Sequence, residues 1–500
     1  MICITIAQSS RRLAMADMLN AVQMGADLLE IRLDTFDNDA EPKELLQARR
    51  KPVIFSCRRR EDGGSWRGSE DERIMLLKTA IISGADYCEL EYDIADQVRR
   101  FGTCQRVISY TNLKETPSDI AEIYEELRHK QPDIVKLTCK ARTPEEAWPL
   151  VQILAKLPVP TVVVGLGRPG VMLAVLGRKI GAPWTAAALE RGMEAYPGQP
   201  TIRDLELVYH YRSITPQTRL IGVTGVGERE YLSTALLNTA LAELDVPIRC
   251  LPLQVGNVRL FRKVIEAVKL LGVVVEEDQQ DALREVAGTI DESVAPVVLN
   301  PGGMPVENSV DLLTAGENKS WHGRHTFGPG AMDALERSLA SRGKSIDGSV
   351  MLFVGLNATA RSIARAAKER GGVLIFASRD RDTSARFSRM LGGRQIPIEA
   401  IYSTLHDVLV VCDETSAASE GTETSELHPG FLKAGMAVMD LTALPRKTPL
   451  LREAQQRGCD VIAPADLLIE QVRRQVHCLT GREAARRPLE KILEQLLDEE

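Results

Sequence analysis

The stretch Leu28-Leu-Glu-Ile-Arg-Leu-Asp34 decides how the first part of this chain folds. It is a short apolar run with charged side chains at alternate positions. Residues two apart in a β-strand point to the same side, so Glu30 and Arg32 share one side of the predicted strand. Opposite charges on an otherwise apolar strand need a polar interior in which to meet. The stretch therefore predicts a strand whose inner side faces a polar site.

Seven similar apolar runs accompany this stretch, and segments with helical periodicity lie between most of them. The eight runs are Ile2–Ala7, Leu28–Asp34, Pro52–Cys57, Tyr87–Tyr92, Arg106–Thr111, Ile134–Lys140, Thr161–Gly167 and Trp184–Leu189. Eight strands alternating with helices over about 200 residues predict a (β/α)8 TIM barrel. A doubly wound open sheet is the alternative, although its strand count is usually lower.

Composition sets the broad class of the protein. The chain has 500 residues, a formal charge of −7, 44% hydrophobic and 26% charged residues, which is typical of globular proteins with about three domains. The acidic balance disfavours a nucleic-acid partner. No apolar run is long enough for a transmembrane span, and the N-terminus lacks the pattern of a signal peptide. Nine scattered cysteines without a Cys-x-x-Cys pair predict a cytoplasmic protein with neither a disulfide framework nor a metal site.

Lys136 is the candidate nucleophile of the predicted barrel, because it lies inside the apolar run Asp133-Ile-Val-Lys-Leu137. A lysine in such a strand is costly to bury. One interpretation is a structural lysine that reaches solvent or pairs with a carboxylate. The other is a desolvated amine that forms a Schiff base with a ketone.

A second α/β unit is predicted after residue 215. Ser349–Gly355, Ala358–Arg370 and Gly372–Ala377 form a strand–turn–helix–strand unit, and Asp407–Val411 and Met436–Leu441 extend a Rossmann-like sheet. A strand is also expected at Pro296–Leu299, and residues 302–330 are expected to be irregular. The acidic residues 413–426 predict an exposed loop. A terminal helix is predicted over Pro488–Leu497.

The first part resembles the type I 3-dehydroquinate dehydratases. The matching stretches are Ala26–Asp34, Cys57-Arg58 with Asp62-Gly-Gly64, Val107–Pro117, Asp133–Lys136 and Tyr196–Gln199. The resemblance implies that Lys136 forms an imine with the substrate ketone and that no cofactor is needed. It implies substrate contacts from Thr5, Glu30, Arg32, Arg58, Asp62 and Gln199, the last of which closes the site.

Several positions depart from that family. Thr111 stands where the family has its proton-carrying His, Ala174 where it has an Arg for the substrate carboxylate, and Ala195 where it has a Ser. Asp62 replaces a Glu. A threonine hydroxyl does not carry protons near neutral pH, so we expect a weakened dehydratase.

Further stretches of the second part carry a resemblance: Ser349–Arg361 in the nucleotide turn, Gly328-Pro-Gly330, Asp440 with Thr448–Leu451, and Asp466–Gln471 with Leu479-Thr-Gly481. With the order of the elements, they resemble the shikimate dehydrogenases. The two parts together resemble fused enzymes of the shikimate pathway, which leads to chorismate and the aromatic amino acids. The resemblance implies three domains: a barrel over 1–214, a substrate domain over 218–330 and a Rossmann-like NADP domain over 331–500. It implies substrate contacts from Ser233 and Gln471 and cofactor contacts from Gly355 and Arg379. Gln280 and Phe327 stand where the family has its catalytic Lys and Asp.

The nucleotide turn also departs from the family, because Gly355-Leu-Asn-Ala358 replaces a glycine-rich turn, and Asp380 adjoins Arg379. We therefore expect weak NADP binding or none, and an impaired dehydrogenase.

Three functions remain open from the sequence. The first is a 3-dehydroquinate dehydratase working through Lys136 and fused to an impaired dehydrogenase-like module. The second is a non-catalytic protein that binds a shikimate-type ligand or a partner enzyme on two altered enzyme scaffolds, and the third is an altered lyase or aldolase-like Schiff-base enzyme for a related ketoacid. The small-molecule partner that we expect is 3-dehydroquinate or a similar anionic cyclic ketoacid, with no nucleic-acid or membrane partner. A homodimer is left open.

Overall fold

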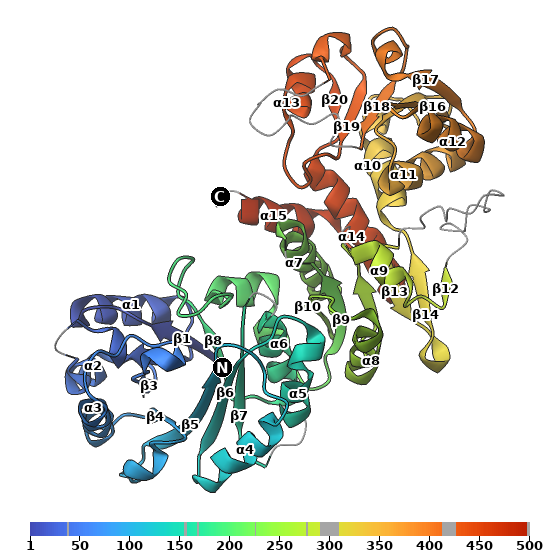
Figure 1. The fold of residues 1–500 in the computed structure, drawn as a ribbon. Helices are drawn as coiled ribbons and strands as arrows, with labels where there is room; N and C mark the ends of the chain where they lie inside the picture. Colours follow the sequence, from blue (N-terminus) through green and yellow to red (C-terminus); the bar gives the residue numbers. More distant parts are fainter. Residues whose placement is uncertain are drawn as a thin grey trace. The chain divides into compact units, whose positions relative to one another are not determined.

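The structure is a computed structural model that describes residues 1–37, 40–154, 158–167, 170–225, 227–276, 279–290, 310–412 and 427–497. The chain divides into two compact units, Met1–Gly222 with Pro247–Lys269 and Val223–Val246 with Leu270–Glu500 (Figure 1). Among the described helices, none is both long and apolar enough to cross a membrane.

The first unit is built on eight parallel strands. They are β1 (Ile2–Ile6), β2 (Leu28–Arg32), β3 (Val53–Ser56), β4 (Tyr87–Glu91), β5 (Gln105–Asn112), β6 (Ile134–Lys140), β7 (Thr161–Leu166) and β8 (Thr185–Ala187). Neighbours in the sheet follow chain order from β1 to β7, and β8 pairs with β1. The strands β7 and β8 are in contact but share no hydrogen-bonded ladder, so the barrel is nearly closed. The barrel prediction is confirmed, and the open sheet is excluded.

Helices follow most of the strands and cover the outside of the barrel (Figure 1). They are α1 (Arg11–Gln23), α2 (Pro42–Ala48), α3 (Glu70–Ile82), α4 (Ile120–His129), α5 (Pro144–Leu154) and α6 (Val171–Ile180). Local sequence sets their beginnings: Ser69 and Glu72 form a capping box at α3, in which each side chain accepts the other residue's backbone N–H. After β4 the chain makes only a short 3-10 turn, Ala95–Gln97.

The interior of the barrel has an apolar layer below a polar one. Inward residues near the strand beginnings form a buried cluster that includes Cys3, Leu28, Ile54, Val107, Ile134, Val162 and Trp184. Two residues further along most of these strands, the inward side chain is polar. These residues are Thr5, Glu30, Ser56, Glu89, Ser109 and Lys136, all buried. The period of two along each strand thus places a polar layer toward the carboxyl ends, where barrels of this kind hold their sites.

Two six-stranded sheets follow the barrel along the chain. The first has the order β10-β9-β11-β13-β14-β12. Its strands are β9 (Arg219–Thr224), β10 (Ile248–Leu253), β11 (Gly272–Val274), β12 (Thr289–Ile290), β13 (Leu312–Ala315) and β14 (Trp321–Arg324). The helices that accompany them are α7 (Glu228–Glu243), α8 (Val258–Val268) and α9 (Gln280–Arg284).

The second sheet is parallel throughout and has the order β17-β16-β15-β18-β19-β20. Its strands are β15 (Val350–Val354), β16 (Val373–Ser378), β17 (Arg394–Pro397), β18 (Val408–Val411), β19 (Ala437–Asp440) and β20 (Asp460–Val461). Numbered along the chain this is the order 3-2-1-4-5-6 of dinucleotide-binding sheets. The accompanying helices are α10 (Phe327–Ala340), α11 (Ala358–Glu369), α12 (Arg381–Leu391), α13 (Pro449–Gln456), α14 (Pro464–Thr480) and α15 (Arg486–Leu497). Buried apolar clusters lie against both faces of the sheet, so the predicted Rossmann-like fold is confirmed.

The expectation of irregular structure over 302–330 is wrong where the chain is described. The strands β13 and β14 form an antiparallel hairpin, and α10 begins at Phe327. The buried Asp311 carboxylate accepts the backbone N–H groups of Thr326 and Phe327, which starts the helix. Pro329 lies in the first turn, where a missing N–H costs nothing. The glycines and the proline of this stretch suggested a loop, and that prediction is wrong for its described residues.

Two other expectations fall outside the described residues: the strand at 296–299 and the acidic loop at 413–426. The terminal helix begins at Arg486, two residues before the expected Pro488.

Candidate active site

A buried cluster of two cations and two carboxylates lies in the polar layer of the barrel. Lys136 Nζ donates to Glu89 Oε2 at 2.7 Å and lies 3.5 Å from Glu30 Oε2. The guanidinium of Arg58 donates to Glu30 Oε1 at 2.6 Å and lies 3.5 Å from Glu89 Oε2. Three of these residues were predicted from sequence. Glu89 was missed, although its place two residues before Glu91 on an apolar strand was an available signal.

The charges in this cluster compensate one another. Burial alone would raise the pKa of the Glu30 carboxyl, but the positive charges of Arg58, Lys136 and Arg32 outweigh burial and hold that pKa well below its usual range. Burial disfavours the charged guanidinium of Arg58, but Glu30 and Glu89 outweigh that effect and raise its pKa. The opposite groups of the cluster therefore favour the charged forms of Glu30 and Arg58.

One hydrogen-bond donor in the cluster has no acceptor among the described residues. The Nε atom of Arg58 is buried and has no hydrogen-bond partner among the described residues. A buried donor without an acceptor is costly, so a ligand oxygen that reaches Arg58 would relieve this cost.

Arg32 positions the loop after β3 through its ion pair with Asp34. Its guanidinium makes two hydrogen bonds to the Asp34 carboxylate, at 2.9 and 2.7 Å. That carboxylate also accepts the backbone N–H groups of Arg58 and Ser65 at 3.1 and 2.8 Å. Arg32 and Asp34 together therefore fix the loop after β3 that carries Arg58 and Asp62.

Gln199 ties the last barrel loop to the first strand. Its side-chain amide donates to Thr5 Oγ1 at 3.1 Å and accepts the backbone N–H of Ala195 at 2.7 Å. These two hydrogen bonds tie the loop from Ala195 to Gln199 to β1, and the role of Gln199 in closing the site stays a prediction.

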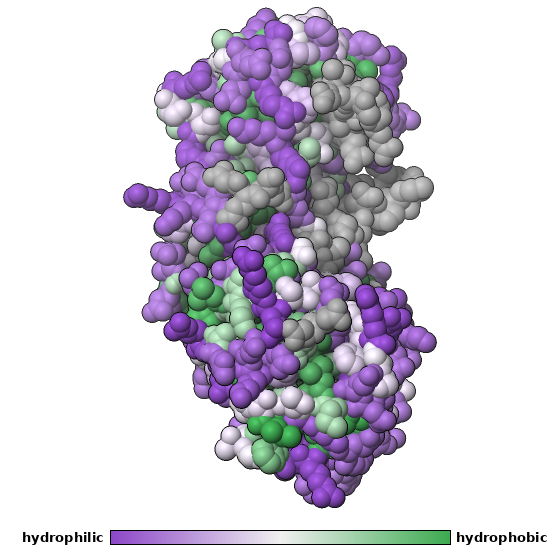
Figure 2. Space-filling view, turned by 90° about the vertical axis from the view of Figure 1, so that its left-hand side faces the viewer, coloured by the Kyte–Doolittle hydropathy of each residue, from purple (hydrophilic) through white to green (hydrophobic). Residues whose placement is uncertain are grey.

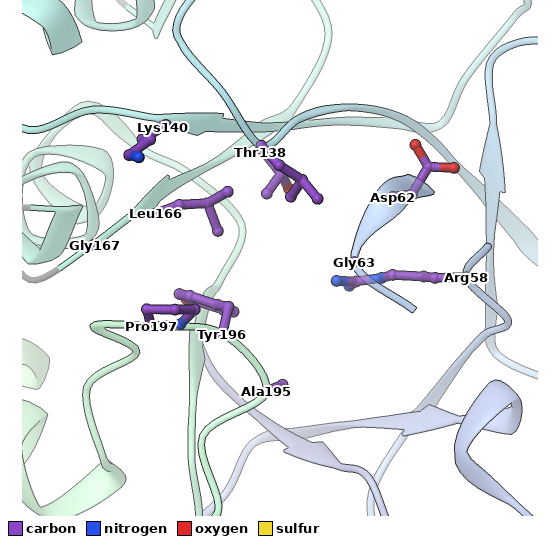
Figure 3. A pocket seen from close by; sticks show the side chains of 11 residues that line it. Arg58, Asp62, Gly63, Thr138, Lys140, Leu166, Gly167, Ala195, Tyr196 and Pro197 are labelled. Atoms are coloured by element: carbon purple, nitrogen blue, oxygen red, sulfur yellow. The ribbon is translucent and has the colours of Figure 1, made fainter. Parts of the chain in front are cut away.

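Two cavities lie one above the other along β6. The inner one holds only about 10 Å³ and is lined by Thr5, Glu30, Arg58, Lys136, Thr138, Val164, Ala186, Ala195 and Tyr196. The outer one holds about 390 Å³ and is lined by Arg58, Asp62, Gly63, Leu113, Thr138, Lys140, Leu166, Gly167, Ala195, Tyr196 and Pro197 (Figure 3). Four residues line both cavities: Arg58, Thr138, Ala195 and Tyr196. The outer volume lies in the range of sites for small molecules.

The positions that depart from the resembled family lie around this site. Thr111 pairs with Thr138 across the β5–β6 ladder, so both side chains are on the same side of the sheet, toward the outer cavity. Ala174 is a buried residue of α6 and does not line either cavity. Ala195 lines both, with a methyl group in place of a hydroxyl.

In the second unit, the predicted substrate residues Ser233 and Gln471 are buried, and neighbouring polar groups are hydrogen-bonded or ion-paired with one another. Gln471 Nε2 lies 3.4 Å from Asp311 Oδ2, whose carboxylate also caps α10. Ser233 is buried within α7. The Arg229 guanidinium lies 5.3 Å from the ring centre of Phe327 and pairs with Glu276 at 3.1 Å. Asp311, Arg229 and Glu276 were missed from sequence.

The turn after β15 fits a dinucleotide poorly. Gly355 adopts a φ of 73°, as such turns require. The Asn357 side chain, however, caps α11 by accepting the N–H of Ala360 at 2.9 Å and donates to Cys412 O at 2.7 Å. In dinucleotide-binding sheets the amides at this helix start face the pyrophosphate. The Asn357 side chain thus accepts the backbone N–H of Ala360, which a bound phosphate would otherwise accept.

The predicted contact for the NADP 2′-phosphate follows the neighbouring parallel strand β16, at the same edge of the sheet. Arg379 is exposed after β16. The neighbouring Asp380 carboxylate caps α12, and its hydrogen bonds to Thr383 and to the backbone of Asp382 hold its pKa below the ordinary value. A fixed negative charge therefore adjoins Arg379. Among the described residues, no group of three or more His, Cys, Asp or Glu is placed to hold a metal ion.

Comparison with known proteins gives the relationship of both parts. The family model of type I 3-dehydroquinase matches residues 2–216. The bifunctional 3-dehydroquinate dehydratase/shikimate dehydrogenase of Arabidopsis thaliana is 26% identical over 504 residues, which is 96% of this chain and 82% of that protein. The 3-dehydroquinate dehydratase of Methanopyrus kandleri is 31% identical over 193 residues, which is 37% of this chain and 87% of that protein.

A solved structure, dehydroquinate dehydratase and shikimate dehydrogenase from S. pombe AroM, is 17% identical with a TM-score of 0.45, covering 99% of this chain and 98% of that one. The barrel, its buried lysine, the match over residues 2–216 and the M. kandleri relative agree on one assignment. This chain belongs, through its barrel, to the type I 3-dehydroquinase family.

Proposed function

We propose that the barrel dehydrates 3-dehydroquinate through an imine on Lys136. The observation that carries this proposal is the place of Lys136: a buried amine that lines the small inner cavity, next to the outer cavity of about 390 Å³, and is hydrogen-bonded to Glu89. Only the neutral amine attacks a ketone, so the ammonium must first lose a proton. Glu89, at 2.7 Å, is the group within reach to accept it.

The proton transfers that follow imine formation lack the histidine that carries them in the resembled family. After imine formation, a base must remove the proton next to the imine carbon, and an acid must help the leaving hydroxyl depart as water. Thr111 lies where the resembled family carries a His for these transfers. Loss of general acid–base catalysis costs about 10²–10⁴-fold in rate. We therefore propose a slow dehydratase.

The test is reduction of the imine by sodium borohydride in the presence of 3-dehydroquinate. We expect a stable adduct on the peptide that contains Lys136, and none with Lys136→Met. Because Lys140 lies on the same short peptide, fragment ions must place the adduct between the two lysines. An adduct that is absent, or that sits on Lys140, contradicts the proposal. Appearance of the conjugated enone product then separates a dehydratase from a protein that stops at the imine.

We propose for the second unit a binding role without hydride transfer, the second candidate function for this chain. The supporting observations are Phe327 beneath Arg229 where a catalytic Asp is expected, and Asn357 in the nucleotide turn. In this proposal NADPH binds weakly or not at all. We also propose a cytoplasmic protein, because none of its nine cysteines forms a disulfide and eight of them are buried.

A further inference from the structure

The outer cavity presents one cation, Lys140, that forms no ion pair with a carboxylate of the described residues. Three charged side chains line it: Arg58, Asp62 and Lys140. Arg58 is held by Glu30 at 2.6 Å, and Asp62 accepts from Arg59 Nε at 2.8 Å. Within the described part of the chain, the ammonium of Lys140 makes no ion pair. The nearby Glu146 carboxylate is taken by Arg142, at 2.9 Å.

The register of β6 places this cation relative to the nucleophile. Residues 136, 138 and 140 point to the same side of the strand. Lys136 lines the inner cavity, Thr138 lines both, and Lys140 lines the outer one. Four residues of strand span about 13 Å, and two flexible lysine stems reduce this distance to the length of a small acid. Figure 3 shows Lys140 across the cavity from Arg58.

The rest of the outer wall fits the body of such a ligand. Leu113, Leu166 and Pro197 supply apolar surface to the cavity, while Thr138 adds a hydroxyl. Ligand sites typically combine such apolar walls with a few polar groups that fix orientation. The outer cavity therefore offers an apolar face for a ring and, at its rim, a positive charge that is not held in an ion pair.

We propose that the Lys140 ammonium binds the carboxylate of the ligand whose ketone meets Lys136. This inference rests on the proposed function for the identity of the ketone, but the carboxylate contact itself does not require imine chemistry. It assigns to β6 a second role: the same strand carries the nucleophile and the anchor of the acid group. The ligand lies along the strand, with its ketone inward and its carboxylate toward the rim.

The test uses the full chain and quinate, a ring acid that has no ketone and therefore forms no imine. Calorimetric titration compares quinate with its methyl ester. We expect Lys140→Met to weaken quinate binding about tenfold, because a charge-assisted contact is lost. Lys140→Arg restores binding, and the ester binds the native protein and Lys140→Met equally. Lys43→Met, which removes an exposed charge from α2, leaves quinate binding unchanged.

Other outcomes overturn the inference. Quinate binding that is undetectable in the native chain, or equal in Lys140→Met, removes the carboxylate contact. Inorganic phosphate that displaces quinate at equal concentration reduces Lys140 to a general anion contact and contradicts the assignment. Loss of quinate binding in Lys140→Met together with no borohydride adduct on Lys136 supports the contact and contradicts only the imine. An adduct on Lys136, together with quinate binding that Lys140→Met does not change, supports the imine and contradicts the carboxylate contact.

Discussion

Replacing Lys136 with methionine removes the cation that faces two buried carboxylates. Glu30 keeps a close partner, because Arg58 donates to its other oxygen at 2.6 Å. Glu89 keeps only the 3.5 Å approach of Arg58. We therefore expect the uncompensated charge of Glu89 to account for most of the destabilisation in Lys136→Met.

The magnitude follows from the burial of the pair. Removing one partner of a buried ion pair lowers the free energy of unfolding by about 3–5 kcal/mol. The remaining approach of Arg58 places Lys136→Met at the lower end, about 3 kcal/mol. Methionine keeps most of the volume of the lysine stem, so a cavity adds little. In Lys136→Met/Glu89→Gln both charges are gone, and we expect at least half of that loss to be recovered.

The assay is urea unfolding at neutral pH, followed by hydrogen exchange of amides in β4 and β6. These amides report on the barrel alone, which matters because a chain with two units need not unfold in one step. Lys43→Met serves as the control for removal of one exposed positive charge. The reasoning is refuted if Lys136→Met unfolds within about 0.5 kcal/mol of the native barrel, or if the two substitutions are additive within that margin.

Three further predictions concern pH, proton transfer and the nucleotide turn. Because the pKa of Glu30 is lower in the folded chain than in the unfolded one, its contribution to stability is complete above about pH 4.3 and is lost as the pH falls below that value. Unfolding measured across acidic pH should show this slope, and Glu30→Gln should flatten it; an unchanged slope contradicts the role of Glu30. Thr111→His should raise the dehydratase rate by at least about tenfold, measured as enone formation, and no gain would mean that a histidine there does not reach the imine. Asn357→Gly should strengthen NADPH binding, measured by quenching of protein fluorescence, whereas equal binding by the native chain would show that the asparagine does not obstruct the turn.

Much of the barrel could be predicted from sequence because its strands are marked by strong local signals. The eight apolar runs coincide with β1–β8 within two residues at each end. The alternation of Glu30 and Arg32 correctly placed both inside the barrel. Partners were harder to predict, since the choice of Asp34 for Arg32 and Glu89 for Lys136 depends on the geometry of neighbouring strands. A single sequence shows which charged residues are present, but it does not show which of them form ion pairs in the fold.

The second unit was predictable in its sheet and less so in its site. The runs at β15, β16, β18 and β19 are short, apolar and bounded by turns, so the Rossmann-like order followed. The hairpin β13–β14 and the start of α10 were missed, because glycine and proline there suggested a loop. The cap that begins α10 comes from Asp311, sixteen residues away in sequence from Phe327, and no local pattern reveals it.

The alternation of side chains along β6 also limits how this site can change by substitution. Positions that face the cavities recur every second residue, so an anchoring cation can move along the strand only in steps of about 6.6 Å. Moving the cation from position 140 to position 138 would exclude a ring and admit only a short-chain ketoacid. Smaller adjustments of ligand length must come from side-chain length, as in the exchange of lysine for arginine. A single strand thus limits the accepted ligands to a few discrete sizes.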